Sequence, residues 1–185
     1  MEVNENERVQ SIADAYEKGI SLYVMTKSFG LAGLRVGWLA TRDASFLKEV
    51  CSYKLYISIC NSAPSEILAI IALRAKDQIL KRNRNIMLKN LSILDAFMER
   101  NQKYLSWTRP KGGTMAVLKL LLPITVEDFA SHLVETEGVL IMPSSVFDLP
   151  GNFFRIGFGR KNMPDVLKRF ESYLQKQGMQ NELSY

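Results

Sequence analysis

A helical pattern of apolar residues over residues 77–100 narrows the folds open to this chain of 185 residues. Helices on the surface of globular proteins usually carry one apolar stripe, which faces the core. Here there are two adjacent seams, and a helix with two apolar seams is expected to pack against two bodies. The pattern therefore predicts two lobes joined by one long helix. The seams are Leu80, Met87, Leu91, Leu94 and Met98, and Ile79, Ile86, Ile93 and Phe97.

Short runs with strand character lie on both sides of this helix. Residues 21–25 and 35–41 are rich in Val, Leu, Tyr and Trp, and we interpret both as short buried strands. Residues 115–122, 139–142 and 153–159 are predicted strands in the second half of the chain.

Helix signals separate these strands. Asp43 and Thr125 are predicted N-caps, and Gly138 is predicted to end the helix that Thr125 begins. A last helix is predicted to begin after Asn162 and to stop at Gly178. Strands that alternate with helices indicate an α/β or α+β arrangement.

The composition excludes several classes of protein. Apolar runs such as residues 68–73 are far shorter than the roughly 20 residues of a membrane span, and the acidic, polar N-terminus is not a signal peptide. Cys51 and Cys60 match neither a CxxC pair nor a zinc spacing, so we expect reduced thiols with packing roles in a cytoplasmic protein. The only histidine, His132, is expected on a helix surface, and no metal site is predicted.

Residues 26–35 read TKSFGLAGLR and place Lys27 and Arg35 eight residues apart, with Gly30 and Gly33 between them. A P-loop is excluded, because no glycine precedes Lys27 at the required positions. The simplest interpretation is a lysine with its head in water and an arginine in an ordinary ion pair. Another is the GxxG loop of a KH-like RNA-binding module, although the basic run at residues 81–84 is more typical of a solvated helix face.

A third interpretation accounts for the whole combination. A lysine that forms a Schiff base must lose its proton near neutral pH, which burial or nearby positive charge can bring about. An arginine fork binds the oxygens of a cofactor phosphate bidentately, and glycines let the backbone pass close to a ligand. Lys27, Arg35, Gly30 and Gly33 meet these requirements within nine residues.

Residues 27–38, KSFGLAGLRVGW, closely resemble the lysine signature of class I/II aminotransferases, the fold-type-I enzymes that use pyridoxal 5′-phosphate. The resemblance implies that Lys27 forms the Schiff base with the cofactor and then moves a proton between substrate and cofactor. It also implies that Arg35 holds the cofactor phosphate. Thr26 stands just before the lysine, where the family usually has a small hydroxyl residue.

The similarity continues on both sides of this stretch. Residues 11–21 are similar to the family's segment that leads into the lysine strand, and the pair Gly112-Gly113 precedes a predicted strand, as it often does in the family. Residues 152–159, NFFRIGFG, resemble the strand whose arginine binds the substrate α-carboxylate, which implies that role for Arg155. A surface arginine in an ion pair is the alternative for Arg155.

The resemblance covers only the C-terminal half of the family. The glycine-rich phosphate loop, the aromatic residue that stacks on the ring and the aspartate that pairs with the pyridine nitrogen have no counterpart here. Val24 stands where the family commonly has a serine that helps to hold the phosphate. Because the protein tunes the cofactor through these groups, a truncated chain is expected to be weak or inactive alone, and a non-catalytic interaction fragment is an alternative.

These observations combine into one expectation. Residues 1–90 would be the C-terminal part of a large domain that binds the cofactor, and residues 91–185 a small α/β C-terminal domain joined to it by the long helix. The reaction would be amino-group transfer between an amino acid and a 2-oxo acid, with pyridoxal 5′-phosphate on Lys27. A second copy in a dimer, or a separate N-terminal half, is the expected partner, and neither nucleic acid nor membrane is expected.

Overall fold

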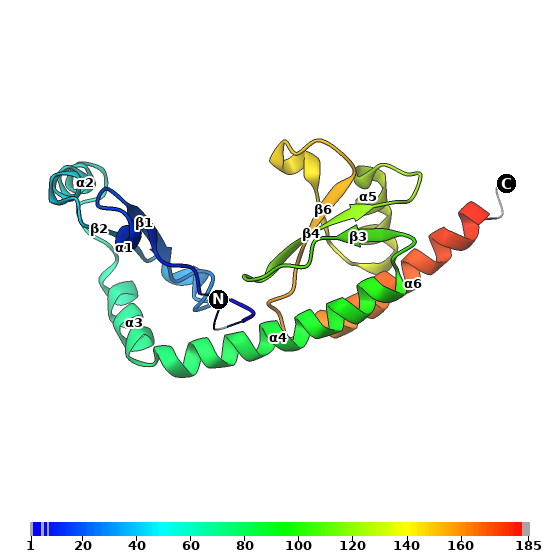
Figure 1. Cartoon of the computed structure of the whole chain (residues 1–185), viewed down its shortest axis with the longest axis horizontal. Helices are drawn as coiled ribbons and strands as arrows, with labels where there is room; N and C mark the ends of the chain where they lie inside the picture. Colours follow the sequence, from blue (N-terminus) through cyan, green and yellow to red (C-terminus); the bar gives the residue numbers. More distant parts are fainter. Residues whose placement is uncertain (1, 5, 7, 183–185) are drawn as a thin grey trace. The chain divides into compact units, whose positions relative to one another are not determined.

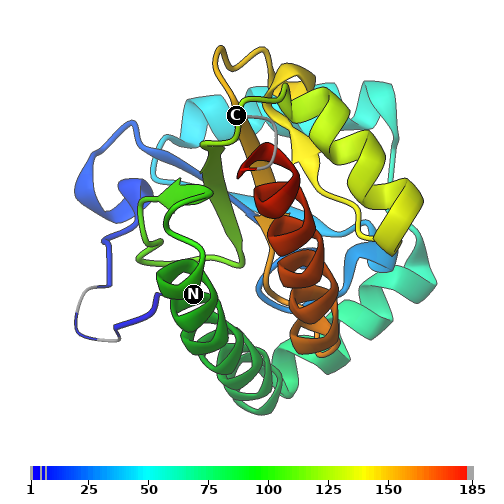
Figure 2. The same cartoon turned by 90° about the vertical axis from the view of Figure 1, so that its right-hand side faces the viewer.

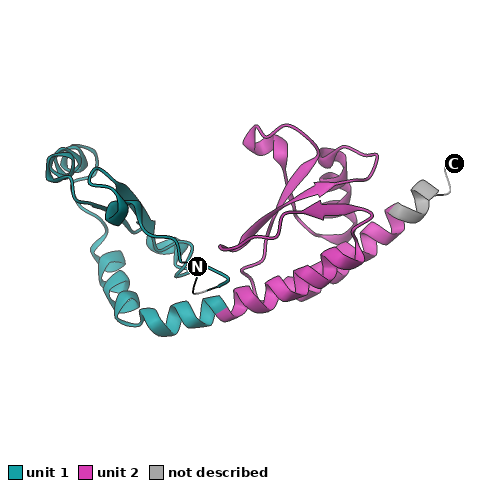
Figure 3. Ribbon diagram, viewed as in Figure 1, with its two compact units in different colours: residues 1–84 teal, residues 85–185 magenta. Residues whose placement is uncertain are grey.

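The computed structural model describes residues 2–4, 6 and 8–182. The chain folds into two compact units, one ending at Arg84 and the other beginning at Asn85 (Figure 3). Helix α4 (Lys76–Arg100) contributes residues to both units, so the predicted long helix is present. The division lies six residues before the predicted domain boundary, after residue 90. Both units mix helices and strands, which confirms the predicted α/β class.

Unit 1 is built around a two-stranded antiparallel sheet (Figure 1). In this sheet Ile20 pairs with Thr41 and Val24 with Gly37. The predicted cap at Asp43 is confirmed, because its carboxylate accepts a hydrogen bond of 3.0 Å from the Phe46 amide. The elements are α1 (Ile12–Ala15), β1 (Ile20–Val24), the 3-10 helix η2 (Ala32–Leu34), β2 (Gly37–Thr41), α2 (Ala44–Ile57) and α3 (Ala63–Arg74).

The strands of unit 1 differ from the prediction in two respects. They are not buried: Leu22 is 71% exposed and Trp38 39% exposed. A sheet of two strands offers little cover to either face, which explains the exposure. In addition, β2 begins at Gly37 rather than at residue 35, and Arg35 has a left-handed backbone that no strand residue adopts.

A small core fixes the connection between β1 and β2. Met25 is fully buried and packs with Ala69 and Ala72 of α3. Partly buried apolar residues of the connection and of α4 surround these three, so the segment that carries Lys27 is anchored on α3 and α4 by its apolar side chains. The surrounding residues are Phe29, Leu31, Leu34, Val36 and Ile79.

Unit 2 contains a four-stranded antiparallel sheet with the order β3-β4-β6-β5. Helices α5 and α6 and the last turns of α4 cover one face of it (Figure 2). Burial alternates along β4, with Leu118 buried and Val117 47% exposed, so the other face of the sheet is open. The elements are β3 (Leu105–Trp107), β4 (Met115–Leu120), α5 (Val126–Glu137), β5 (Met142–Pro143), the 3-10 helix η3 (Ser144–Phe147), β6 (Phe153–Gly157) and α6 (Met163–Glu182).

Aromatic side chains form the core of unit 2. Phe129 of α5 lies with its ring centroid 6.2 Å from that of Phe154 on β6 and 5.3 Å from that of Tyr173 on α6. The Phe97 ring of α4 lies tilted against that of Phe170 on α6, with the ring centroids 5.4 Å apart. These contacts join three helices to the sheet, and pairs of this kind add about 0.5–1.5 kcal/mol beyond the area they bury.

Four element boundaries in unit 2 differ from the prediction, and at two of them strands β4 and β6 each end two residues early. Residues 139–141 alternate in exposure like a strand, at 3%, 79% and 3%, but only Met142 and Pro143 pair with β6. Helix α6 continues through Gly178 to Glu182, because a glycine inside a helix costs only about 1 kcal/mol relative to alanine. The predicted cap at Thr125 and the stop at Gly138 are confirmed.

The predicted packing role of the cysteines is wrong, since Cys51 and Cys60 are both free and exposed. His132 is exposed, as predicted. Over the described part of the chain, no helix is both long enough and apolar enough to span a membrane.

Candidate functional site

The predicted cofactor residues of unit 1 lie on the loop between β1 and β2. The Met25 amide donates to the Val36 carbonyl at 3.1 Å, which extends the pairing of the two strands by one step. Thr26 follows Met25 directly and Arg35 precedes Val36 directly. The ten residues 26–35 therefore form a loop closed at its base, and Lys27 is the second residue of this loop.

Internal hydrogen bonds shape this loop. The Leu31 amide donates a hydrogen bond of 3.0 Å to the Met25 carbonyl, and the Gly30 amide donates one of 3.1 Å to the Lys27 carbonyl. Gly30 has φ +70°, a conformation that glycine adopts without the steric cost of a side chain. The turn itself therefore explains why a glycine occurs at position 30.

The two cations of the loop are exposed and lack acidic partners. Within the described residues, the Lys27 side chain makes no hydrogen bond or ion pair, and the Arg35 guanidinium donates only to the Ala32 carbonyl, at 3.2 Å. Arg35 has φ 53° and ψ 36°, which costs an L-residue roughly 1–2 kcal/mol. The interpretation of Arg35 as half of an ordinary ion pair therefore has no support.

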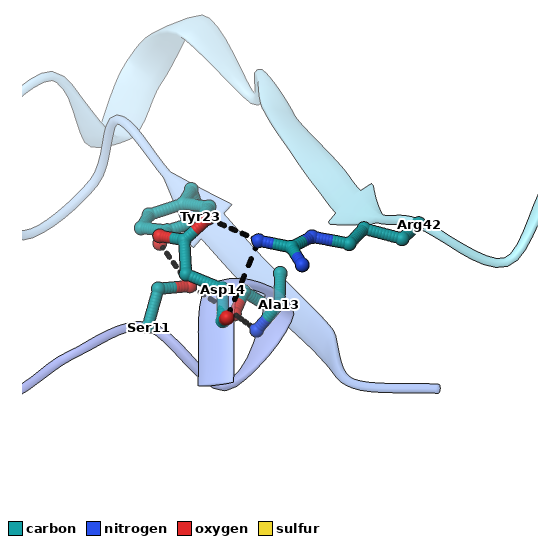
Figure 4. Close-up of polar contacts among 6 residues, drawn as sticks. Ser11, Ala13, Asp14, Tyr23 and Arg42 are labelled. Carbon is teal, nitrogen blue, oxygen red and sulfur yellow. Dashed lines mark hydrogen bonds and ion pairs between the residues drawn. The ribbon is translucent and has the colours of Figure 1, made fainter. Parts of the chain in front are cut away.

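A polar network ties the preceding segment to the same sheet (Figure 4). The Ser11 and Ser21 hydroxyls lie 2.7 Å apart, and the Tyr23 hydroxyl donates to that of Ser11 at 3.0 Å. Arg42 donates to the Asp14 carbonyl at 3.3 Å and lies 3.9 Å from the Asp14 carboxylate. Residues before β1 are thus joined to β1 and to Arg42, which directly follows β2.

Arg155 lies in unit 2, on the open face of the sheet. In β6 it pairs with Val117 on one side and Met142 on the other. Its guanidinium carbon lies 4.6 Å from the Phe147 ring centroid, and Nη2 lies 3.2 Å from Met142 Sδ. The residue is half-buried at a mostly apolar cavity of 320 Å³, whose lining includes Phe153.

No carboxylate among the described residues pairs with Arg155, so the ion-pair alternative for it also has no support. A guanidinium that lies on apolar and aromatic surface keeps its N–H donors available for an anion. Because a guanidinium is weakly hydrated, its desolvation on binding costs less free energy than that of a lysine ammonium. A carboxylate is the ligand that such a group binds bidentately.

Two asparagines of α4 that the sequence interpretation overlooked hold backbone near the predicted residues. Asn83 donates to the Ser28 carbonyl at 2.9 Å, and Asn90 donates to the carbonyls of Phe158 and Arg160 at 2.9 and 2.7 Å. A signal was present in the sequence, because both asparagines fall at helical spacing with the apolar seam of α4.

The loop of unit 1 fits a group that carries an aldehyde and a phosphate. The Lys27 amine can react with the aldehyde. The Arg35 guanidinium can bind the phosphate, because it pairs with no carboxylate among the described residues. The Thr26 hydroxyl is half-exposed beside them. Pyridoxal 5′-phosphate has both functional groups.

Comparison with known proteins agrees with this chemistry. Residues 3–170 match the family model described as aminotransferase class I and II. The chain is 25% identical over 142 residues to capreomycidine synthase of Streptomyces vinaceus, a match that covers 77% of this chain and 36% of the relative. It is 25% identical over 181 residues to nicotianamine aminotransferase A of Hordeum vulgare, covering 89% and 39%.

A solved structure is also similar. The PLP-dependent aminotransferase of Streptococcus suis 89-1591 superposes with a TM-score of 0.85 and 30% identity, over 91% of this chain and 45% of that one. The chain thus spans less than half the length of each of these three proteins.

The family match includes Gly30 and Gly33, so the KH-like interpretation of these glycines is unsupported. It also includes Lys27, Arg35 and Arg155, although their roles stay predictions. The match covers most of the chain, and the fold agrees with that of solved relatives. The chain belongs to the class I and II aminotransferase family.

Proposed function

We propose that this protein takes part in amino-group transfer between an amino acid and a 2-oxo acid, with pyridoxal 5′-phosphate as the cofactor. One observation carries the proposal. A closed loop inside the family match presents a lysine amine and an arginine held in a left-handed conformation, and neither cation has an acidic partner among the described residues. Strained conformations of this kind concentrate at ligand sites.

Each residue has a defined part in this proposal. When bound, the cofactor supplies a ring that accepts electrons from the substrate Cα. The Lys27 amine would hold the cofactor at its aldehyde carbon and would carry the proton of the substrate Cα. Arg35 and the Thr26 hydroxyl hold the phosphate, and Arg155 binds the substrate α-carboxylate.

We further propose that the chain alone supports this reaction weakly. It spans 36% and 39% of the two named relatives, so most of a relative's residues have no counterpart here. A second copy of the chain, or a separate polypeptide that supplies the other part of the fold, is the proposed partner. Two free, exposed thiols favour a reducing compartment such as the cytoplasm.

Covalent labelling tests the role of Lys27. The purified chain is mixed with pyridoxal 5′-phosphate, reduced with borohydride and digested, and the label on each lysine is measured by mass spectrometry. We expect Lys27 to be labelled at least tenfold above the exposed Lys48, because a phosphate anchor raises the effective concentration of the aldehyde at one amine.

Two variants complete this test. Lys27→Ala should abolish the preferential label, whereas Lys18→Ala, which removes another exposed lysine of the same unit and keeps the Lys48 reference, should leave it unchanged. Label spread evenly over many lysines of the wild-type chain would contradict the proposal.

A further inference from the structure

We infer that Asn83 and Asn90 of helix α4 are positioning residues: Asn83 holds the loop that carries Lys27, and Asn90 holds the chain that follows the Arg155 strand. The inference rests on the proposed function of these two cations. It assigns the two asparagines to backbone positioning, so that the functional side chains themselves stay free.

Both polar atoms of the Asn83 side-chain amide make hydrogen bonds. Its Nδ2 donates to the Ser28 carbonyl at 2.9 Å, and its Oδ1 accepts from Arg82 Nη1 at 3.1 Å. Ser28 follows Lys27 directly, so the hydrogen bond acts one residue from the amine. A Cβ built at Gly30 would lie 3.6 Å from Asn83 Nδ2, so the amide lies beside Gly30 as well as Ser28.

Asn90 acts in the same way in unit 2 and is only 2% exposed. Its Nδ2 donates to the Phe158 carbonyl at 2.9 Å and to the Arg160 carbonyl at 2.7 Å. On the other side, the Phe158 amide donates to the Thr114 carbonyl at 2.8 Å. The chain is therefore held from two directions three residues after Arg155.

The placement on one helix supports a shared purpose. Seven residues make nearly two turns, or about 10.5 Å of rise, so Asn83 and Asn90 share a face of α4. Met87 and Leu94 on that face are fully buried. An asparagine there lowers helix propensity and carries a desolvation cost, which only its hydrogen bonds offset. Leucine would suit the helix and the seam better, so the amides are explained by the carbonyls they hold.

Hydrogen exchange of the full chain tests this inference with two variants that control each other. Asn83→Leu and Asn90→Leu keep the number and branching of the side-chain heavy atoms, and each removes the hydrogen bonds of one asparagine amide. We expect Asn83→Leu to speed exchange of the Gly30 and Leu31 amides about three- to tenfold, and Asn90→Leu to do the same for the Phe158 amide, because a net hydrogen bond is worth about that factor. Neither should change the other's segment.

A second readout separates positioning from stability. Labelling of Lys27 by pyridoxal 5′-phosphate, relative to Lys48, should fall in Asn83→Leu and stay at the wild-type level in Asn90→Leu. Asn90→Ala replaces Asn90→Leu if the latter is unfolded by circular dichroism.

The inference is overturned if the segments exchange as in the wild type, if both variants loosen both segments alike, or if Asn83→Leu loosens its loop while Lys27 labels normally. Absence of preferential labelling in the wild-type chain would instead reject the proposed function. The exchange rates would still decide whether the two asparagines hold these segments.

Discussion

Arg35 shows how a single residue links backbone geometry to the predicted chemistry. Its φ of 53° ends the short helix η2 and turns the chain into β2. Glycine or asparagine would meet this turn at lower steric cost. The proposed function explains the arginine at this position by what its guanidinium would bind rather than by the fold, so Arg35 is a residue where stability and function should separate.

Arg35→Asn tests that separation. We expect the variant to raise the free energy of unfolding of unit 1 by about 0.5–1 kcal/mol, because asparagine populates the left-handed region more readily. In a Trp107→Phe background, Trp38 is the only tryptophan and reports urea unfolding of unit 1. The same variant should need about tenfold more pyridoxal 5′-phosphate for half-labelling of Lys27, because the bidentate charge pair is lost.

Arg160→Asn is the matched control for this prediction. Arg160 is exposed and is not among the described non-glycine residues with positive φ. It should change neither the unfolding of unit 1 nor the labelling of Lys27. A loss of stability in Arg35→Asn of more than about 1 kcal/mol would show that the guanidinium supports the fold.

At the scale of elements, most local signals were interpreted correctly, with the helix stop at Gly178 as an exception, whereas tertiary ones were not. The long helix and the caps at Asp43 and Thr125 follow from periodicity and from short-range hydrogen bonds. Residues 139–141 carry a strand's alternation of burial, yet pairing needs a neighbouring strand that the sequence does not identify. The spacing of Lys27 and Arg35 located the loop, but not the left-handed backbone of Arg35, which arginine rarely adopts.

The attachment of α6 to α4 is an element-scale contact with a pH dependence. Arg100 donates two hydrogen bonds to Glu171, at 2.7 and 2.9 Å, and Asn101 adds one at 3.0 Å. The Arg100 hydrogen bond, helped by that from Asn101, lowers the pKa of Glu171 below its ordinary 4.5 although burial opposes this. Glu171 is more protonated when unfolded than when folded near that pH, so its contribution is complete well above pH 4.5 and declines as pH falls through the folded pKa.

Glu171→Gln should therefore destabilise unit 2 by about 1 kcal/mol at pH 7, a figure that allows for solvent screening of the exposed arginine. The difference from wild type should shrink as the pH falls below 4.5. Trp107 in a Trp38→Phe background reports the unfolding of unit 2. Glu135→Gln, at an exposed position of α5, should show no such trend. A difference that stays constant from pH 7 to pH 3 would mean that the carboxylate charge does not stabilise this contact.

For the whole molecule, the solvent-accessible surface area is larger than that expected for compact proteins of the same total mass. The chain exposes 12639 Å² at 21.0 kDa, whereas two separate compact proteins of half that mass would together expose about 10,900 Å². Most of the large apolar side chains that are exposed among the described residues belong to unit 1. Helix α3 is apolar nearly all round, which is typical of a helix buried in a larger body. Its exposed apolar residues are Ile67, Leu68, Ile70, Ile71 and Leu73, at 40–59%.

Exposed apolar surface on this scale predicts association. In sedimentation velocity the chain should sediment as species larger than a monomer, in proportions that depend on concentration. The double variant Ile67→Glu/Ile71→Glu places two charges one turn apart on α3 without touching the buried Ala69 and Ala72, and should shift the chain toward monomer. Leu140→Glu is the control, because Leu140 is 79% exposed in unit 2 between buried neighbours. If the wild-type chain stays monomeric at high concentration, or if Leu140→Glu dissociates it equally, α3 is not the surface that a partner covers.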